Sequence, residues 1–293
     1  MCDLCGDVQH DPVVSRRAFL KTGAASALAP MIAGAAFAAD PPKPGAAPPP
    51  NAIAPADALK RLMEGNARYA ANAPNERDFS SGRAARSQAQ YPIATILSCS
   101  DSRVAPELVF DQSPGDLFVC RVAGNVVTKD LLASIEYGAQ FLGSPLIVVM
   151  GHSACGAVSA AIKTAHTDTK LPGHLPELID AIKPSVVLAE KNKTGTLLDN
   201  AIAENVRQQV ARLKSSAPIV QKGYRDKKIE IVGGVYDIAT GKVTLAWSDC
   251  SRLGRWSTAL LDACGNDSPR VDIDALRNVG GQGARCRDRR LHR

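Results

Sequence analysis

Long apolar runs that stop abruptly on polar residues dominate the middle of the chain. The stretches YPIATILS at 91–98 and PLIVVMGH at 145–152 are almost continuously apolar, and DLFVCRV at 116–122 is a third run of this kind. Strands of a parallel sheet are buried on both faces, so their apolar residues need not alternate with polar ones. These three runs therefore predict inner strands of a parallel sheet.

Segments with helical spacing separate the runs. The residues 55–72 place Leu59, Leu62, Met63 and Tyr69 on one side of a helix, and residues 130–143 repeat this pattern. We expect further helices over 157–165, near 176–191 and over 197–216, and two final strands over 228–247 joined by a turn at 240–241. Alternating strands and helices predict an α/β fold, with a mostly parallel central sheet and helices on both faces.

Chemically active side chains follow the predicted strands where each strand ends. Cys99, Asp101 and Arg103 come after the first run, and His152 and Cys155 come after the third. The second run carries an arginine, residue 121, next to its last residue. Functional sites of parallel α/β folds gather at the carboxyl ends of the strands. We therefore expect these side chains to share one site.

Two thiols and one imidazole form a suitable ligand set for zinc. His152 and Cys155 are three residues apart, so one tight turn can aim both at the same point, and Cys99 can reach it from the neighbouring strand. Three protein ligands leave the fourth position open, which is typical of catalytic rather than structural zinc. The alternative is that the cysteines are small buried hydrophobes and the histidine a core residue.

The motifs CSDSR at 99–103 and GHSACGA at 151–157 together resemble the β-class carbonic anhydrases, as do SIEYG at 134–138 and GGVYDIATGKV at 233–243. The resemblance spans residues 54–247. It implies one zinc ion per subunit, held by Cys99, His152 and Cys155. It also implies a catalytic Asp–Arg dyad at Asp101 and Arg103, a catalytic glutamine at Gln90 that reaches the pocket of a partner subunit, and a substrate-binding backbone N–H at Gly156.

The function implied by the resemblance is the reversible hydration of carbon dioxide to bicarbonate and a proton, through attack by zinc-bound hydroxide. Because two thiolates offset the charge of the metal, we expect activity to rise toward alkaline pH. A homodimer or a higher even homo-oligomer is also implied. Two alternatives stay open: a hydrolase of carbonyl sulfide or carbon disulfide at the same site, and a non-catalytic protein that binds zinc or bicarbonate.

The first 38 residues resemble a twin-arginine export signal. Arg16 and Arg17 lie in SRRAFLK, a weakly apolar run of about 17 residues follows, and Ala36-Phe37-Ala38 matches a cleavage pattern. The run is short, rich in alanine and broken by a proline, which argues against the alternative of a membrane anchor. We expect transient contact with the twin-arginine export machinery, cleavage after Ala38, and a periplasmic or otherwise exported protein.

The rest of the chain divides by composition. Residues 39–53 are rich in proline and alanine and predict a linker, residues 54–266 hold the zinc domain, and residues 267–293 form a basic tail that we expect to be disordered. From Arg270 to Arg293 the tail has seven arginines against three aspartates, so this stretch carries +4 of the net charge of +6. Basic residues are not interleaved with aromatic ones, so no nucleic-acid partner is expected. A disulfide between Cys250 and Cys264 is one option after export.

Overall fold

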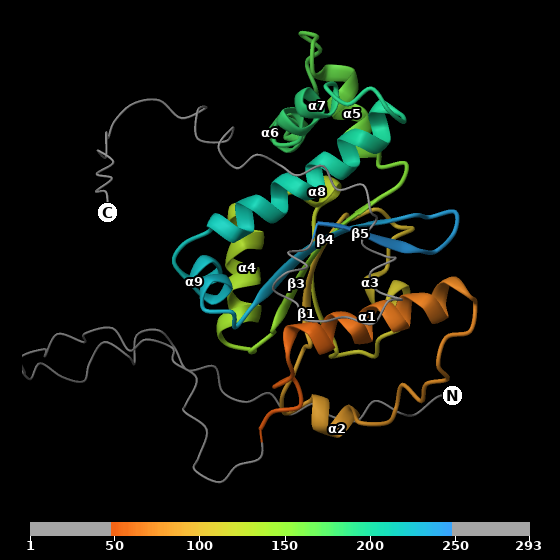
Figure 1. The fold of residues 1–293 in the computed structure, drawn as a ribbon, viewed down its shortest axis with the longest axis vertical. Helices are drawn as coiled ribbons and strands as arrows, with labels where there is room; N and C mark the ends of the chain where they lie inside the picture. The colour runs from red at the N-terminus through yellow and green to blue at the C-terminus, as the bar shows by residue number, and fades with distance from the viewer. Residues whose placement is uncertain (1–47, 248–293) are drawn as a thin grey trace, which may run out of the picture. The chain divides into compact units, whose positions relative to one another are not determined.

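The computed structural model describes residues 48–247 of the chain (Figure 1). The strands are, in chain order, β1 (Ala94–Ser98), β2 (Leu117–Arg121), β3 (Leu146–His152), β4 (Glu230–Tyr236) and β5 (Val243–Trp247). The helices are α1 (Pro55–Ala70), α2 (Arg83–Arg86), α3 (Pro106–Val109), the 3-10 helix η1 (Ala123–Asn125), α4 (Lys129–Gln140), α5 (Gly156–Thr164), α6 (Leu175–Asp180), α7 (Lys183–Ala189), α8 (Leu197–Ser215) and α9 (Ile219–Arg225).

The five strands form one sheet in the order β2-β1-β3-β4-β5. The first four strands run parallel, and β5 pairs with β4 in the antiparallel direction. The mostly parallel sheet predicted from the apolar runs is confirmed, as is the pair of strands near residue 240. Since β1 and β3 are neighbours and point the same way, the residues that follow them lie at the same edge of the sheet.

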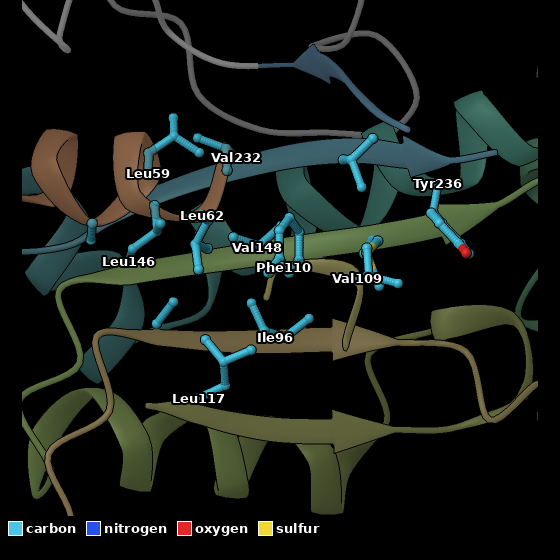
Figure 2. Close-up of a cluster of buried hydrophobic side chains, with 14 of the residues drawn as sticks. Leu59, Leu62, Ile96, Val109, Phe110, Leu117, Leu146, Val148, Val232 and Tyr236 are labelled. Atoms are coloured by element: carbon cyan, nitrogen blue, oxygen red, sulfur yellow. The ribbon is translucent and has the colours of Figure 1, made fainter. Parts of the chain in front are cut away.

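Alternate residues of each strand point to opposite faces of the sheet. Both faces are buried under apolar side chains. Ile96 and Val148 belong to an apolar cluster beneath α1 and α3, which Figure 2 shows together with Phe110 and Leu62. The next residues along the strands, such as Leu97, belong to a second cluster under α4, α8 and α9. In Figure 1 the sheet lies between α1 and α8, which is the predicted cover on both faces.

A third apolar cluster lies beyond the carboxyl ends of β1 and β3. It contains Cys99, Val126 and Cys155 together with buried side chains of α5, α6, α7 and the first half of α8. Figure 1 shows α5, α6 and α7 grouped at this end of the sheet. The edge that carries the chemically active residues is therefore enclosed by apolar side chains.

The backbone of α1 packs closely against the backbone of the segment that follows α3. A Cβ atom added to Gly65 of α1 would lie 1.9 Å from the carbonyl oxygen of Phe110, so only glycine allows this approach. The buried Asn66 donates to the carbonyls of Val109 and Gly241 and accepts from Val243 N–H. These bonds join α1 to α3 and to the β4–β5 turn.

The structure differs from the sequence-based expectations in a few elements. The helix expected near 176–191 is two helices, α6 and α7, because Pro184 lacks the N–H that a continuous helix would need there. The short helices α2 and α9 were not anticipated. Asn51, inside the predicted linker, is buried and donates to the carbonyls of Pro92 and Leu142, so packing begins before residue 54.

Several predicted features lie outside the described residues. They are the export signal at 1–38, most of the linker, the basic tail at 267–293 and the Cys250–Cys264 pair. Between residues 48 and 247, no helix combines the length and the apolar character that a membrane crossing requires.

Candidate metal centre

The three candidate ligands converge at the edge where β1 and β3 end. Cys99 directly follows β1, His152 is the last residue of β3, and Cys155 immediately precedes α5. Their two sulfur atoms and one imidazole nitrogen all lie within 4.8 Å of one another, and all three residues are buried. The structure therefore brings together the side chains that the strand-end pattern predicted.

The imidazole of His152 is oriented as a metal ligand requires. Its Nδ1 atom lies 2.9 Å from the carbonyl oxygen of Ser153, which fixes the proton on that nitrogen. Within residues 48–247, Nε2 of His152 is buried without a hydrogen-bond partner. A buried nitrogen lone pair facing two thiols is the donor set that zinc prefers, so the residues present fit this ion.

The two thiols perturb each other. A hydrogen bond from Cys155, with smaller contributions from His152 and the N–H of Gly124, lowers the pKa of Cys99 to about 4, against the opposing effect of burial. The same bond, together with burial, raises the pKa of Cys155 far above its usual range. The two shifts run in opposite directions, because the hydrogen bond between the thiols favours the charged form of Cys99 and the neutral form of Cys155. A cation between the sulfur atoms would replace the proton and stabilise both thiolates.

Asp101 and Arg103 form the predicted ion pair beside this cluster. Nε and Nη2 of Arg103 donate to the two oxygens of Asp101 at 2.9 and 2.7 Å, and the Arg103 N–H adds a third bond at 3.0 Å. These bonds hold the pKa of Asp101 far below its usual range. Oδ2 of Asp101 lies 3.9 Å from Nε2 of His152, so the carboxylate faces the point where the ligands converge.

Two arginines connect the loops of the site. Arg103 donates to the carbonyl of Ala154 at 3.3 Å and so joins the loop after β1 to the loop after β3. Arg121, at the end of β2, donates to the carbonyls of Cys99 and Asp101 at 3.0 and 2.8 Å. The sequence placed Arg121 at a strand end, but its contacts with the Cys99–Asp101 backbone could not be read from spacing.

Gly156 and Gln90 occupy different surroundings. Gly156 begins α5 directly after Cys155. Apart from its chain neighbours and the backbone of its own helix, no described atom lies within 4 Å of the position that a Cβ would take there. Gln90 is exposed and precedes β1, at the opposite end of that strand from Cys99. A five-residue strand spans about 16 Å, so the described chain does not bring its own Gln90 to the candidate ligands.

The comparisons with known proteins point to one family. The family model described as "Carbonic anhydrase" matches residues 94–243. A carbonic anhydrase of Mycolicibacterium smegmatis is 38% identical over 192 residues, which cover 65% of this chain and 93% of that protein. Carbonic anhydrase 2 of Mycobacterium tuberculosis is 37% identical over 192 residues, covering 65% and 92% of the two chains.

Solved structures agree with this finding. The β-carbonic anhydrase of Coccomyxa, in complex with acetazolamide, is 30% identical and superposes with a TM-score of 0.51, over 64% of this chain and 85% of that one. The β-carbonic anhydrase CcaA is also 30% identical, with a TM-score of 0.50 over 65% and 88% of the two chains. The residues that the family model matches include β1 to β4 and the cluster of Cys99, His152 and Cys155.

Proposed function

Because the chain belongs to the β-class carbonic anhydrase family, we propose that it hydrates carbon dioxide reversibly to bicarbonate at a zinc ion held by Cys99, His152 and Cys155. The observation that carries the proposal is the convergence of three buried ligand atoms within 4.8 Å beside a paired carboxylate. When bound, zinc lowers the pKa of a coordinated water and so supplies a nucleophile for carbon dioxide.

Asp101 and Arg103 would orient the attacking water. Arg103 donates two hydrogen bonds to Oδ1 of Asp101 and one to Oδ2, so Oδ2, which faces His152 Nε2, keeps a lone pair. An unpaired carboxylate at this place would itself coordinate the metal, and the bidentate arginine opposes that. Asp101 is therefore free to accept a hydrogen bond from the water and to fix the direction of its attack.

Gly156 and Gln90 would bind the substrate. The N–H of Gly156 lies at the amino end of α5, where the helix dipole favours the negative charge that develops on the substrate oxygens. The open space at Gly156 leaves room for carbon dioxide next to Cys155. Gln90 would donate a hydrogen bond from a second subunit, since its position at the far end of β1 excludes a role within its own chain.

Stopped-flow measurement of carbon dioxide hydration tests the proposal. The zinc-loaded protein should accelerate hydration, and Cys155→Ser should bind less zinc and lose the activity. Leu213→Ala, a buried substitution on α8 remote from the site, should stay active and serves as the matched control. A parent protein that holds zinc but produces no acceleration would support the non-catalytic alternative. Faster turnover of carbonyl sulfide or carbon disulfide would reassign the substrate.

We propose that the active form is a homodimer or a higher even homo-oligomer. The segment that carries Gln90 also exposes Phe79 and Tyr91, with 57% and 44% of their surface accessible, and such side chains are typical of interfaces. Mixing Gln90→Ala and Cys155→Ser chains tests this assembly. A mixed dimer should regain activity, because one of its sites combines an intact zinc site with an intact Gln90. No recovery from verified mixed dimers would contradict it.

We further propose export through the twin-arginine machinery, supported by Arg16, Arg17 and the Ala36–Ala38 pattern. Replacing both arginines by lysine should leave the full-length protein inside the cell. The exported parent should begin at Ala39, which amino-terminal sequencing can determine. Export of the double-lysine variant at the parental level would contradict this route.

A further inference from the structure

The loop between β2 and α4 passes directly over one of the candidate zinc ligands. The N–H of Gly124 donates a hydrogen bond to Sγ of Cys99 at 3.2 Å. Gly124 has φ of +75°, and a Cβ there would lie 2.5 Å from Cδ1 of Ile182. The next residue, Asn125, also has a positive φ, of +43°. Glycine adopts a positive φ freely, but this conformation is less favourable for Asn125, so contacts around the loop must maintain it.

Two amide side chains of α8 hold this loop in place. Nδ2 of Asn205 donates to the carbonyl of Gly124 at 2.8 Å, and Oε1 of Gln209 accepts from Val127 N–H at 2.9 Å. Nε2 of Gln209 also donates to Oδ1 of Asn205 at 3.3 Å, so each side chain restrains the conformation of the other. Together they bracket the segment that carries the Gly124 N–H.

The placement of these amides is unusual for their helix face. Asn205 and Gln209 are only 1% and 4% exposed, among neighbours on α8 that are apolar: Ile202, Val206, Val210 and Leu213. Burying an amide is unfavourable unless its hydrogen bonds are made, and leucine would pack there without that requirement. The helix already packs on the sheet through its apolar residues, so the amides need a different explanation.

We propose that Asn205 and Gln209 are positioning residues of the metal centre, which hold the loop so that the Gly124 N–H points at the Cys99 sulfur. The inference rests on the proposed zinc ligation by Cys99. A hydrogen bond to a thiolate stabilises its charge and fixes its direction, and partners of metal ligands commonly affect metal affinity. Two anionic ligands on one dication make such a donor particularly useful.

The test compares Asn205→Ala with Leu213→Ala, a buried apolar control on the same helix. Zinc affinity is measured by competition with a chelator, and the cobalt(II)-substituted proteins give the energy of the sulfur-to-metal charge-transfer band. Asn205→Ala should weaken zinc binding about 10-fold and move the band to lower energy, because the sulfur loses a hydrogen bond. Leu213→Ala should lower the melting temperature but leave the affinity and the band at parental values.

A second variant keeps the test decisive if Asn205→Ala does not fold. Gln209→Met retains the side-chain volume and removes the acceptor of Val127 N–H, and it should shift both readouts in the same direction. Parental zinc affinity and an unchanged band in the folded variants would overturn the inference while leaving the proposed function intact. A parent protein that binds no zinc would instead overturn the proposed function and the inference together.

Discussion

The molecule contains two Asp–Arg clusters that look alike in chemistry and differ in what they connect. Asp111, whose side chain is fully buried, pairs with Arg68 at 2.6 Å and also with Arg77. Asp101 pairs with Arg103 at 2.7 Å, and half of the Arg103 side chain is exposed. Both carboxylates are held ionised by arginines, so the chemistry of the pair alone does not reveal its role.

The sequence distance between the partners separates the two roles. Asp111 pairs with Arg68 on α1, 43 residues away, and with Arg77 in the loop after α1, 34 residues away. These pairs connect the first helix to the domain. Asp101 pairs with Arg103, which lies two residues further along the same loop. A pairing this local contributes little to the tertiary structure. The first cluster therefore ties distant parts of the fold together, and the second is confined to one loop of the candidate metal centre, where we propose that it orients a carboxylate.

The largest expected effect comes from Asp101→Ala. Removing the group that we propose orients the attacking water should reduce kcat/KM about 10³-fold, within the range of acid–base and positioning groups. Zinc content and melting temperature should stay near the parental values, because the pair is local and its arginine half exposed. Stopped-flow hydration, metal analysis and thermal unfolding check these three quantities. If Asp101→Ala also lowered the melting temperature substantially, the Asp101 and Asp111 clusters would not differ in role.

Asp111→Ala should show the opposite profile. It leaves Arg68 and Arg77 facing each other without their shared carboxylate, which should lower the free energy of unfolding by about 3 kcal/mol. Below its own unfolding transition the variant should retain most of the parental kcat/KM. Urea unfolding and hydration rates on the same samples give both numbers. Loss of activity in a sample that is still folded would assign Asp111 to the site.

A smaller effect is expected from Arg103→Lys. Lysine keeps the positive charge but cannot donate to both oxygens of Asp101 in parallel. The loss of one charge-assisted hydrogen bond, about 1.5 kcal/mol, corresponds to a roughly 10-fold decrease in kcat/KM. Equal activity of lysine and arginine at this position would show that charge alone holds Asp101.

The smallest effect concerns acid stability. Although burial raises it, the hydrogen bonds from Arg68 and Arg77 lower the pKa of Asp111 overall. A carboxyl whose pKa is lower in the folded than in the unfolded state stabilises the protein above the unfolded value of about 3.9, and this contribution is lost as pH falls through the folded value.

The difference in unfolding free energy between the parent and Asp111→Asn should therefore be full at pH 7 and should shrink below pH 4. Urea unfolding across this range measures it. Leu213→Ala, which removes no titrating group, should show a difference from the parent that stays constant with pH. A constant difference for Asp111→Asn as well would contradict the proposed ionic role.

The strand ends could be predicted from the sequence because their signal is local. Continuous apolar runs located β1 and β3, and the spacing of His152 and Cys155 placed both on one turn. The pairing of Asp101 with Arg103 was implied by the resemblance of the CSDSR motif to the β-class carbonic anhydrases. Each of these features depends on a few consecutive residues and on the rule that parallel strands end at one edge.

The supporting contacts could not be predicted, because they join residues far apart in the chain. Asn205 lies 81 residues from Gly124, and Gln209 lies 82 from Val127. In the sequence, Asn205 and Gln209 look like ordinary polar residues on the solvent face of an amphipathic helix. The partners of Asp111 were missed for the same reason, since sequence patterns do not specify which distant elements pack together.

The central claim is that Cys99, His152 and Cys155 bind one zinc ion and leave a position open for solvent. X-ray absorption at the zinc edge, combined with metal analysis of the purified protein, tests it most directly. We predict one zinc per chain, with two sulfur atoms at about 2.3 Å and two nitrogen or oxygen atoms at about 2.0–2.1 Å. Absence of zinc, or a coordination shell without sulfur, would contradict the account.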